Sequence, residues 1–167
     1  RYDSMEYYAR KALRLAEEKG ITENTSPKWA MLIEGAIRRK DYAAAEEYWN
    51  RGYQHAGERV RYSWIKTLAE IRNRQGRYDA ALHLLDSSRM MCADTSHYTS
   101  RALWAFHAAE AWEGKGNPAK ALDALKYYCA LKDSIDDEIH GADVLNTREL
   151  WQYEQLKAQN STLQGQK

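Results

Sequence analysis

Three glutamates recur at similar intervals along the chain: Glu34, Glu70 and Glu110. Arg38 and Arg74 each follow a glutamate by four residues, whereas Gly114 stands at this place in the third case. In a helix, residues four apart share a face, and glutamate one turn before arginine is the favourable order for an ion pair. These residue types suit the binding of a polar partner. No two carboxylates are set apart by an environment that would equip them for acid–base catalysis.

Other residues that could take part in metal binding or catalysis form weaker patterns. Two histidines and two cysteines invite a zinc site, but the spacing of Cys92, His97, His107 and Cys129 matches no standard ligand pattern. His107 lies in an apolar stretch that favours a packed histidine, and two cysteines are too few for a disulfide framework. No phosphate-binding loop or nucleophile elbow is present in the sequence. We therefore expect no metal, no cofactor and no enzyme activity.

Charge and hydropathy exclude two further classes of partner. The net charge of the 167 residues is +1, and the short basic run at 38–40 is explained by a helix end, so we expect no nucleic-acid binding by this chain. No apolar run approaches the roughly 18 residues that a membrane span needs. The sequence opens Arg1-Tyr2-Asp3 within a half-repeat, without an initiator methionine, which indicates a fragment of a longer protein.

The segment from Asn73 to Leu85 shows which elements position the glutamates. It predicts a helix end, a turn at Gly76 and a second helix that packs back on the first. The same pattern recurs upstream and downstream, with four residues at matching places: Met5, Ala45, Ala81 and Ala121. The steps of 40, 36 and 40 residues are typical of a helical repeat array.

The repeats divide the chain into a series of helix pairs. Ser26 is expected to cap a helix that begins at Pro27, and Asp41 and Asn117 are expected to cap later helices. The predicted segments are a half-repeat (1–20), three helix pairs (26–57, 58–93 and 95–133), a capping or linker helix (134–160) and a frayed tail (161–167).

The segment 133–160 differs in composition from the rest. It carries seven acidic residues against two basic ones, and its apolar residues fit one broad helical stripe imperfectly. A repeat array needs its last repeat covered by a less apolar element, so we expect a cap. A coiled-coil linker is the competing interpretation, although few clean heptads are present.

The repeats resemble the tetratricopeptide repeat (TPR) family over residues 1–133. The second helices carry the matching residues: Tyr42, Ala45, Trp49 and Gly52; Tyr78, Ala81, Leu85 and Ser88; Pro118, Ala121, Leu125 and Tyr128; and Tyr2, Met5, Ala9 and Ala12. Trp29 and Leu32 match in a first helix, whereas Ile33, Ala69 and Ala109 stand where glycine is usual. The resemblance implies an all-α, right-handed TPR solenoid.

The resemblance also implies where a partner binds. In TPR arrays the column of the three glutamates faces the concave groove, so we expect a groove of mixed charge with an aromatic residue at its C-terminal end. Its expected residues are Glu34, Arg38, Lys66, Glu70, Asn73, Arg74, Phe106 and Glu110. A peptide or partner domain is the expected ligand. The alternative interpretation is that these are ordinary solvated helix faces with surface ion pairs.

The C-terminal segment carries a narrower resemblance. Residues 127–135, followed by an acidic helix that reaches Trp151 and Glu154, look like the end of the TPR region in bacterial membrane-tethered sensors and transcriptional regulators. This implies a sensory or docking module, with the periplasm slightly favoured over the cytoplasm. A scaffold that self-associates, as a homodimer through Tyr7, Tyr8 and Leu15, is the second hypothesis. A small-molecule binder is the third, and it needs a deep enclosed pocket.

Overall fold

The chain is all-α over the residues that are described. The computed structural model describes the backbone of residues 2–91 and 98–165, and the side chains of 3–91, 100–137 and 150–159. Its described helices are α1 (Tyr2–Glu18), α2 (Ser26–Arg38), α3 (Tyr42–Tyr53), α4 (Glu58–Arg74), α5 (Tyr78–Met91), α6 (Tyr98–Gly114) and α7 (Pro118–Gly165). No strand occurs within these ranges. The expected all-α class is therefore confirmed.

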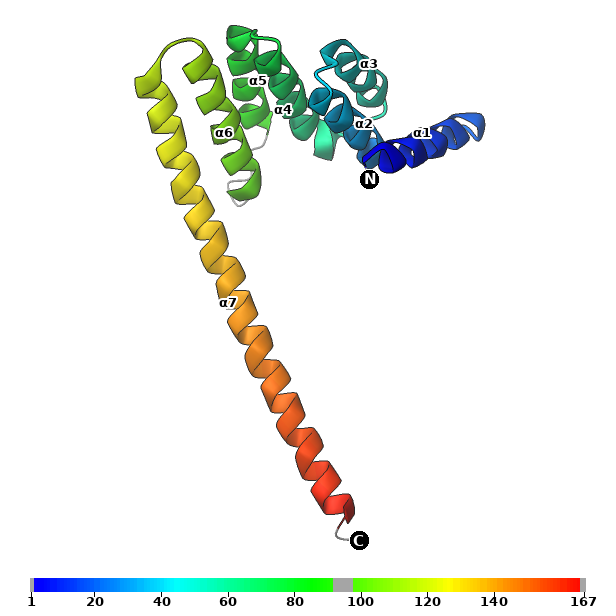
Figure 1. Cartoon of the computed structure of the whole chain (residues 1–167), viewed down its shortest axis with the longest axis vertical. Helices are drawn as coiled ribbons and strands as arrows, with labels where there is room; N and C mark the ends of the chain where they lie inside the picture. The colour runs from blue at the N-terminus through cyan, green and yellow to red at the C-terminus, as the bar shows by residue number, and fades with distance from the viewer. Residues whose placement is uncertain (1, 92–97, 166–167) are drawn as a thin grey trace.

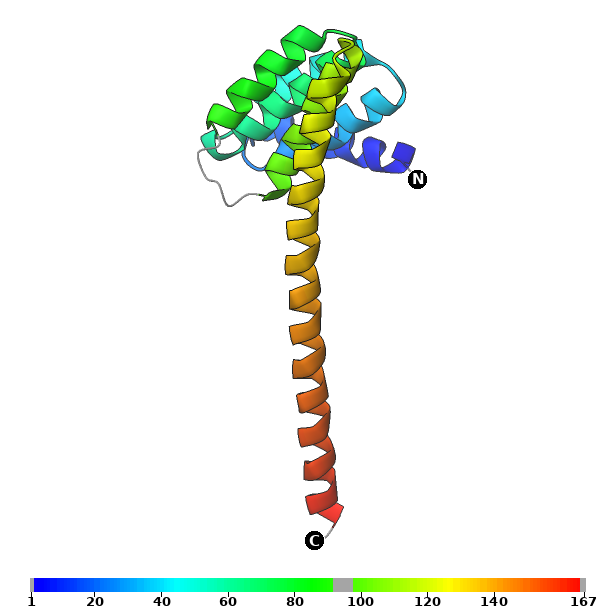
Figure 2. The same ribbon diagram turned by 90° about the vertical axis from the view of Figure 1, so that its left-hand side faces the viewer.

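The helices pack in the order of the sequence. Tight turns reverse the chain between α2 and α3, between α4 and α5, and between α6 and α7, so each of these pairs is antiparallel (Figure 1). Each helix contacts the next, and α4 also contacts α6, so the first helices of these two pairs lie side by side. At one end of the molecule α1 projects from the packed helices, and at the other end α7 extends far beyond the helix pairs (Figures 1 and 2).

One type of turn ends the first helix of each pair and also ends α1. The turns have a residue with a left-handed backbone at the same place: Gly20, Lys40, Gly76 and Gly116. Next to each, a backbone N–H reaches five residues back to a carbonyl of the preceding helix, as from Arg77 to Arg72 at 2.8 Å. The predicted caps follow two of the turns, because Asp41 accepts from the N–H of Ala44 and Asn117 accepts from that of Lys120.

The core has two clusters, one centred on tryptophans and the other composed mainly of alanines. Trp29, Trp49 and Trp64 are buried together between α2, α3 and α4, and the indole N–H of Trp49 donates to the carbonyl of Trp64 at 2.6 Å. A second cluster joins α4, α5 and α6 through Ala69, Ala81, Leu85, Ala108 and Ala111. The small side chains allow the helix backbones to approach closely.

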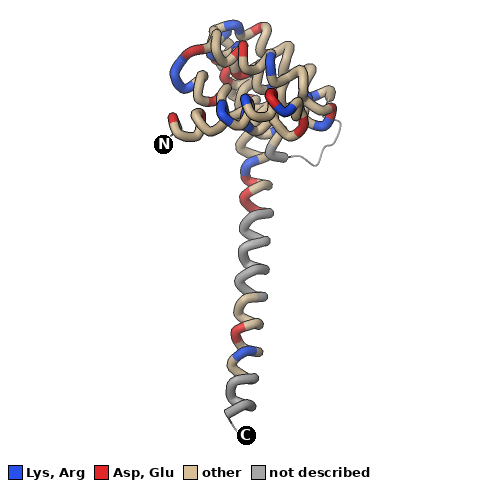
Figure 3. The backbone as a smooth tube through the Cα atoms, turned by 90° about the vertical axis from the view of Figure 1, so that its right-hand side faces the viewer, with Lys and Arg blue, Asp and Glu red and all other residues tan. Residues whose placement is uncertain are grey.

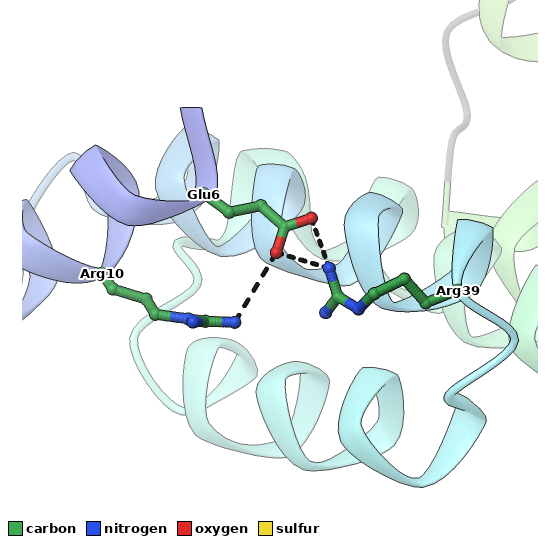
Figure 4. A network of polar contacts seen from close by, with 3 residues as sticks. All are labelled: Glu6, Arg10 and Arg39. Atoms are coloured by element: carbon green, nitrogen blue, oxygen red, sulfur yellow. Dashed lines mark hydrogen bonds and ion pairs between the residues drawn. The ribbon is translucent and has the colours of Figure 1, made fainter. Parts of the chain in front are cut away.

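A buried carboxylate joins α1 to α2, and no sequence pattern indicated this role. Glu6 is buried against Gly35 of α2, and it accepts two hydrogen bonds from Nη1 of Arg39, at 2.5 and 2.6 Å (Figure 4). Arg10 lies 3.6 Å from the same carboxylate. The hydrogen bond from Arg39 thus compensates for the burial of the charge. The helical spacing of apolar residues 5–16 predicts Met5 and Tyr8 in the buried stripe of α1. This prediction is wrong, because burial of the Glu6 face leaves both side chains exposed.

Two expected boundaries are also wrong. The helix that begins at Pro118 does not end near Asp133; it continues to Gly165, so 134–160 is no separate cap and 161–165 remains helical. Nothing in the sequence there breaks a helix, because no proline follows Pro118. At the start of α2 the N-cap position is Thr25, not Ser26, and its side chain makes no capping bond. Asp94, Thr95 and Ser96 are N-cap candidates by residue type for the helix that follows, and they lie outside the described residues.

No helix within the described residues is long and apolar enough to cross a membrane.

The packing at Gly52 predicts that an added methyl group is harmful. A Cβ at Gly52 would collide with the indole of Trp64 and lie 2.7 Å from Cγ of Trp29. Because both rings are buried, Gly52→Ala should lower the free energy of unfolding by about 1–3 kcal/mol. Thermal and urea unfolding followed by circular dichroism measure this. Gly57→Ala is the matched control, since a Cβ there meets nothing within 4 Å; equal losses in the two variants would contradict the prediction.

The turn at Lys40 predicts a stabilising substitution. Lys40 has φ +60°, at the turn position where Gly76 and Gly116 stand in the other pairs. A residue with a Cβ loses about 1 kcal/mol in this conformation, so Lys40→Gly should raise the free energy of unfolding by up to that amount. Lys19→Gly provides the control, because Lys19 is not among the residues with positive φ and its replacement should be neutral or destabilising. A loss of stability in Lys40→Gly would refute this account of the turn.

Candidate functional site

The row of glutamates spans the first helix of each pair. Glu34 lies on α2, Glu70 on α4 and Glu110 on α6. Burial raises the pKa of Glu70, Arg74 opposes the rise, and repulsion from Glu110 and Glu34 adds to it. Because the carboxylate of Glu70 senses both of the others, the structure brings the three glutamates to one side of the molecule.

The α2 end of the row is an ordinary solvated pair. Arg38 lies 2.5 Å from Glu34, and their side chains remain 44% and 65% exposed. An exposed pair of this kind contributes only a few tenths of a kcal/mol to stability, roughly 0.3–0.5 kcal/mol. For Glu34 and Arg38 the geometry is therefore that of the alternative interpretation, a solvated helix face.

The α4–α6 end of the row is different, because polar groups are buried there. The amide nitrogen of Asn73 donates to the backbone carbonyl of His107 at 2.9 Å, which ties α4 to α6. Asn73 is 6% exposed and His107 is 7% exposed. Neither Oδ1 of Asn73 nor Nδ1 of His107 has a hydrogen-bond partner among the described groups. His107 is packed, as the apolar sequence around it predicted, but its pairing with Asn73 was not foreseen.

Charged residues surround this buried pair. Burial lowers the pKa of His107 to about 4, and the positive charges of Lys66 and Arg74 contribute to the decrease. Burial also raises the pKa of Glu110, which Arg74 opposes and Glu113 reinforces. The imidazole is therefore neutral at pH 7. The site combines a neutral, buried hydrogen-bonding pair with two partly desolvated carboxylates.

Phe106 is less available than the sequence suggested. Its ring lies 5.6 Å from that of Tyr128 on α7 and 5.7 Å from that of His107, measured between ring centres. It retains 38% exposure. The predicted aromatic residue therefore lies at the α7 end of the row, partly covered by the last helix.

The residues considered for zinc do not form a site within the described chain. Cys92 and His97 lie outside the described residues, and Cys129 is an exposed free thiol. No group of three or more metal-ligating side chains occurs among the residues that the structure describes. The arrangement at the glutamate row is thus suited to hydrogen bonding and charge recognition.

Comparison with known proteins produced no match to a family model, a curated protein or a solved structure.

The buried histidine predicts a specific dependence of stability on pH. A pKa of about 4 in the folded chain lies below the ordinary value of 6.5, so the stabilising contribution is present above pH 6.5 and is lost as the pH falls through about 4. From about pH 7 to about pH 5 the loss should be roughly 2 kcal/mol. Urea unfolding at both pH values, compared between the native chain and His107→Leu, measures it.

The variant isolates the histidine because Glu70 and Glu110 remain in both proteins. Their raised pKa values act in the opposite sense, adding stability as the pH falls. His107→Leu should therefore lose less stability on acidification than the native chain does. The same decrease in both proteins would show that His107 does not titrate in this way.

Proposed function

We propose that this chain is a non-catalytic protein-interaction module that holds a peptide or a segment of a partner domain along its α4–α6 face. The observation that carries the proposal is the set of polar groups gathered between α4 and α6: the buried hydrogen bond between Asn73 and His107 and the partly buried carboxylates of Glu70 and Glu110. Oδ1 of Asn73 and Nδ1 of His107 have almost no accessible surface, so a bound peptide would contact the partly buried carboxylates beside them and not these two atoms.

The charges at the face favour a partner of particular chemistry. Glu70 and Glu110 are desolvated, and each has a raised pKa because its charged form is disfavoured. A lysine or arginine side chain placed between them would stabilise both carboxylates and donate hydrogen bonds. The exposed part of Phe106 adds a small apolar contact at one end. We therefore infer a basic, donor-rich peptide.

The repeated turns support a TPR-like solenoid as the scaffold of this face. Each of α2, α4 and α6 is followed by a turn residue with a left-handed backbone, beside a backbone N–H that bonds to a carbonyl five residues earlier. The three helix pairs therefore share one type of turn. A sensory role within a larger bacterial regulator rests on the resemblance of residues 127–154 and remains part of the proposal.

Self-association as a scaffold is the second candidate function. Met5, Tyr7, Tyr8 and Leu15 of α1 are 48%, 60%, 65% and 47% exposed, which is a large apolar area for one helix. A second copy would cover this face. A chain that stays monomeric at high concentration would contradict this function.

A peptide selection tests the leading proposal. Random peptides of about 12 residues are selected on the native chain, and the enriched peptides are synthesised and measured by fluorescence anisotropy. We expect enrichment of lysine and arginine. The variant Glu70→Gln/Glu110→Gln should weaken binding at least about tenfold, because it removes the charges that the basic side chains contact.

The control is Glu47→Gln, an exposed residue of α3 away from the row. It should bind the peptides as the native chain does, and circular dichroism should show that all variants are folded. Peptides without basic residues, or peptides that bind the double variant and the native chain equally, would exclude this face as the site.

A further inference from the structure

A concave surface lies on a different side of α6 from the glutamate row. A cavity of about 790 Å³ opens between α5 and α7, with Trp104, Ala108 and Trp112 of α6 among the residues that line it. Phe106 and Glu110 are each two residues from Ala108, which is about 200° around a helix. The cavity and the glutamate row therefore lie on different sides of α6, and Lys66 of α4, an expected groove residue, also lines the cavity. The sequence signal for it is a pair of tryptophans eight residues apart, followed closely by lysines.

Basic side chains are held over the aromatic part of this cavity. The guanidinium of Arg89 lies 5.2 Å from the centre of the Trp104 ring, and Nζ of Lys120 lies 4.3 Å from that of Trp112. The cavity is lined by five basic residues and three aspartates, and the basic ones are Lys66, Arg89, Arg101, Lys115 and Lys120. The lining therefore combines large apolar side chains with a net positive charge. An acidic partner with apolar side chains complements it.

The distal half of α7 has the complementary composition. The sequence from 133 to 160 carries seven acidic residues and two basic ones. Leu150, Trp151, Tyr153 and Leu156 are each 60–64% exposed. The described acidic positions begin where α7 leaves the helix pairs (Figure 3). A helix gains most of its stability in water from packing of an apolar face, so this half of α7 needs a partner.

We propose that the acidic distal half of α7 of one chain lies in the α5–α6–α7 cavity of a second copy. The distance from Asp133 to Leu156 along the helix is about 35 Å, and from Arg101 to Trp112 about 17 Å, so the helix is long enough to follow the whole cavity. Reciprocal exchange of the two α7 helices forms a closed dimer with two equivalent interfaces. The proposed dimer interface is a different surface from the α4–α6 face, and the proposal does not depend on peptide binding there.

Sedimentation equilibrium of the full chain over a range of concentrations tests the proposal. We expect a dimer at about 50 mM sodium chloride that weakens at about 500 mM, because salt screens exposed charges. The cavity variant Arg89→Glu/Lys120→Glu and the helix variant Asp136→Lys/Asp137→Lys should each raise the dissociation constant at least about tenfold. All four residues are exposed, so circular dichroism should show native helix content in both variants.

Mixing the two variants provides the decisive measurement. Each acidic helix then meets a basic cavity and each basic helix meets an acidic one, so a heterodimer should form where neither variant dimerises alone. Failure of the mixture to dimerise overturns the proposal. So does a native chain that is monomeric throughout, or a dimer that only Tyr7→Ser/Tyr8→Ser disrupts, since that result assigns the interface to α1.

The same variants separate this proposal from the peptide-binding function. Arg89→Glu/Lys120→Glu should leave binding of the selected basic peptides unchanged, whereas Glu70→Gln/Glu110→Gln should leave the dimer unchanged. A cavity variant that loses dimerisation while the α7 variant retains it would contradict the proposal, because the occupant of the cavity would then be another acidic segment.

Discussion

The close approach of helices over small side chains is the constraint on which this structure depends. Ala36, Ala45, Ala69, Ala81 and Ala111 are fully buried where consecutive helices meet. Larger side chains at these positions would force the backbones apart. The approach is closest at glycine: Gly52 lies against two tryptophans and Gly35 against the carboxylate of Glu6. Because each helix packs mainly on its sequence neighbours, these contacts set the path of the whole chain.

The same packing explains why polar groups are buried between α4 and α6. Ala69 and Ala111 bring these helices together, and Asn73 and His107 are enclosed with them. The hydrogen bond from Asn73 to the carbonyl of His107 compensates for part of the burial. The polar atoms of this pair that remain without a hydrogen bond lower the stability of the fold locally.

The two sides of α6 differ in chemistry because different neighbours cover them. One side meets α4 and carries carboxylates around a neutral histidine. The other opens between α5 and α7 and presents indole rings beneath basic side chains. A basic peptide and an acidic helix therefore suit different sides of one helix. The two surfaces share Lys66 of α4, but the groups that the two proposed partners would contact are otherwise different.

The sequence alone determined the helices, their turns and the column of glutamates, because these depend on local patterns. The period of apolar residues, the glycine turns and the caps at Asp41 and Asn117 are all signals within one or two helical turns. Only the tertiary structure decided the rest. It buried Glu6 in place of Met5 and Tyr8, paired Asn73 with His107, and opened the cavity beside Trp104 and Trp112. The continuation of α7 to Gly165 is different, because the sequence allows it through the absence of any proline after Pro118, although the acidic composition resembled a separate cap. The burial of Glu6, the Asn73–His107 pair and the cavity all depend on contacts between different helices, which no pattern within one helix encodes.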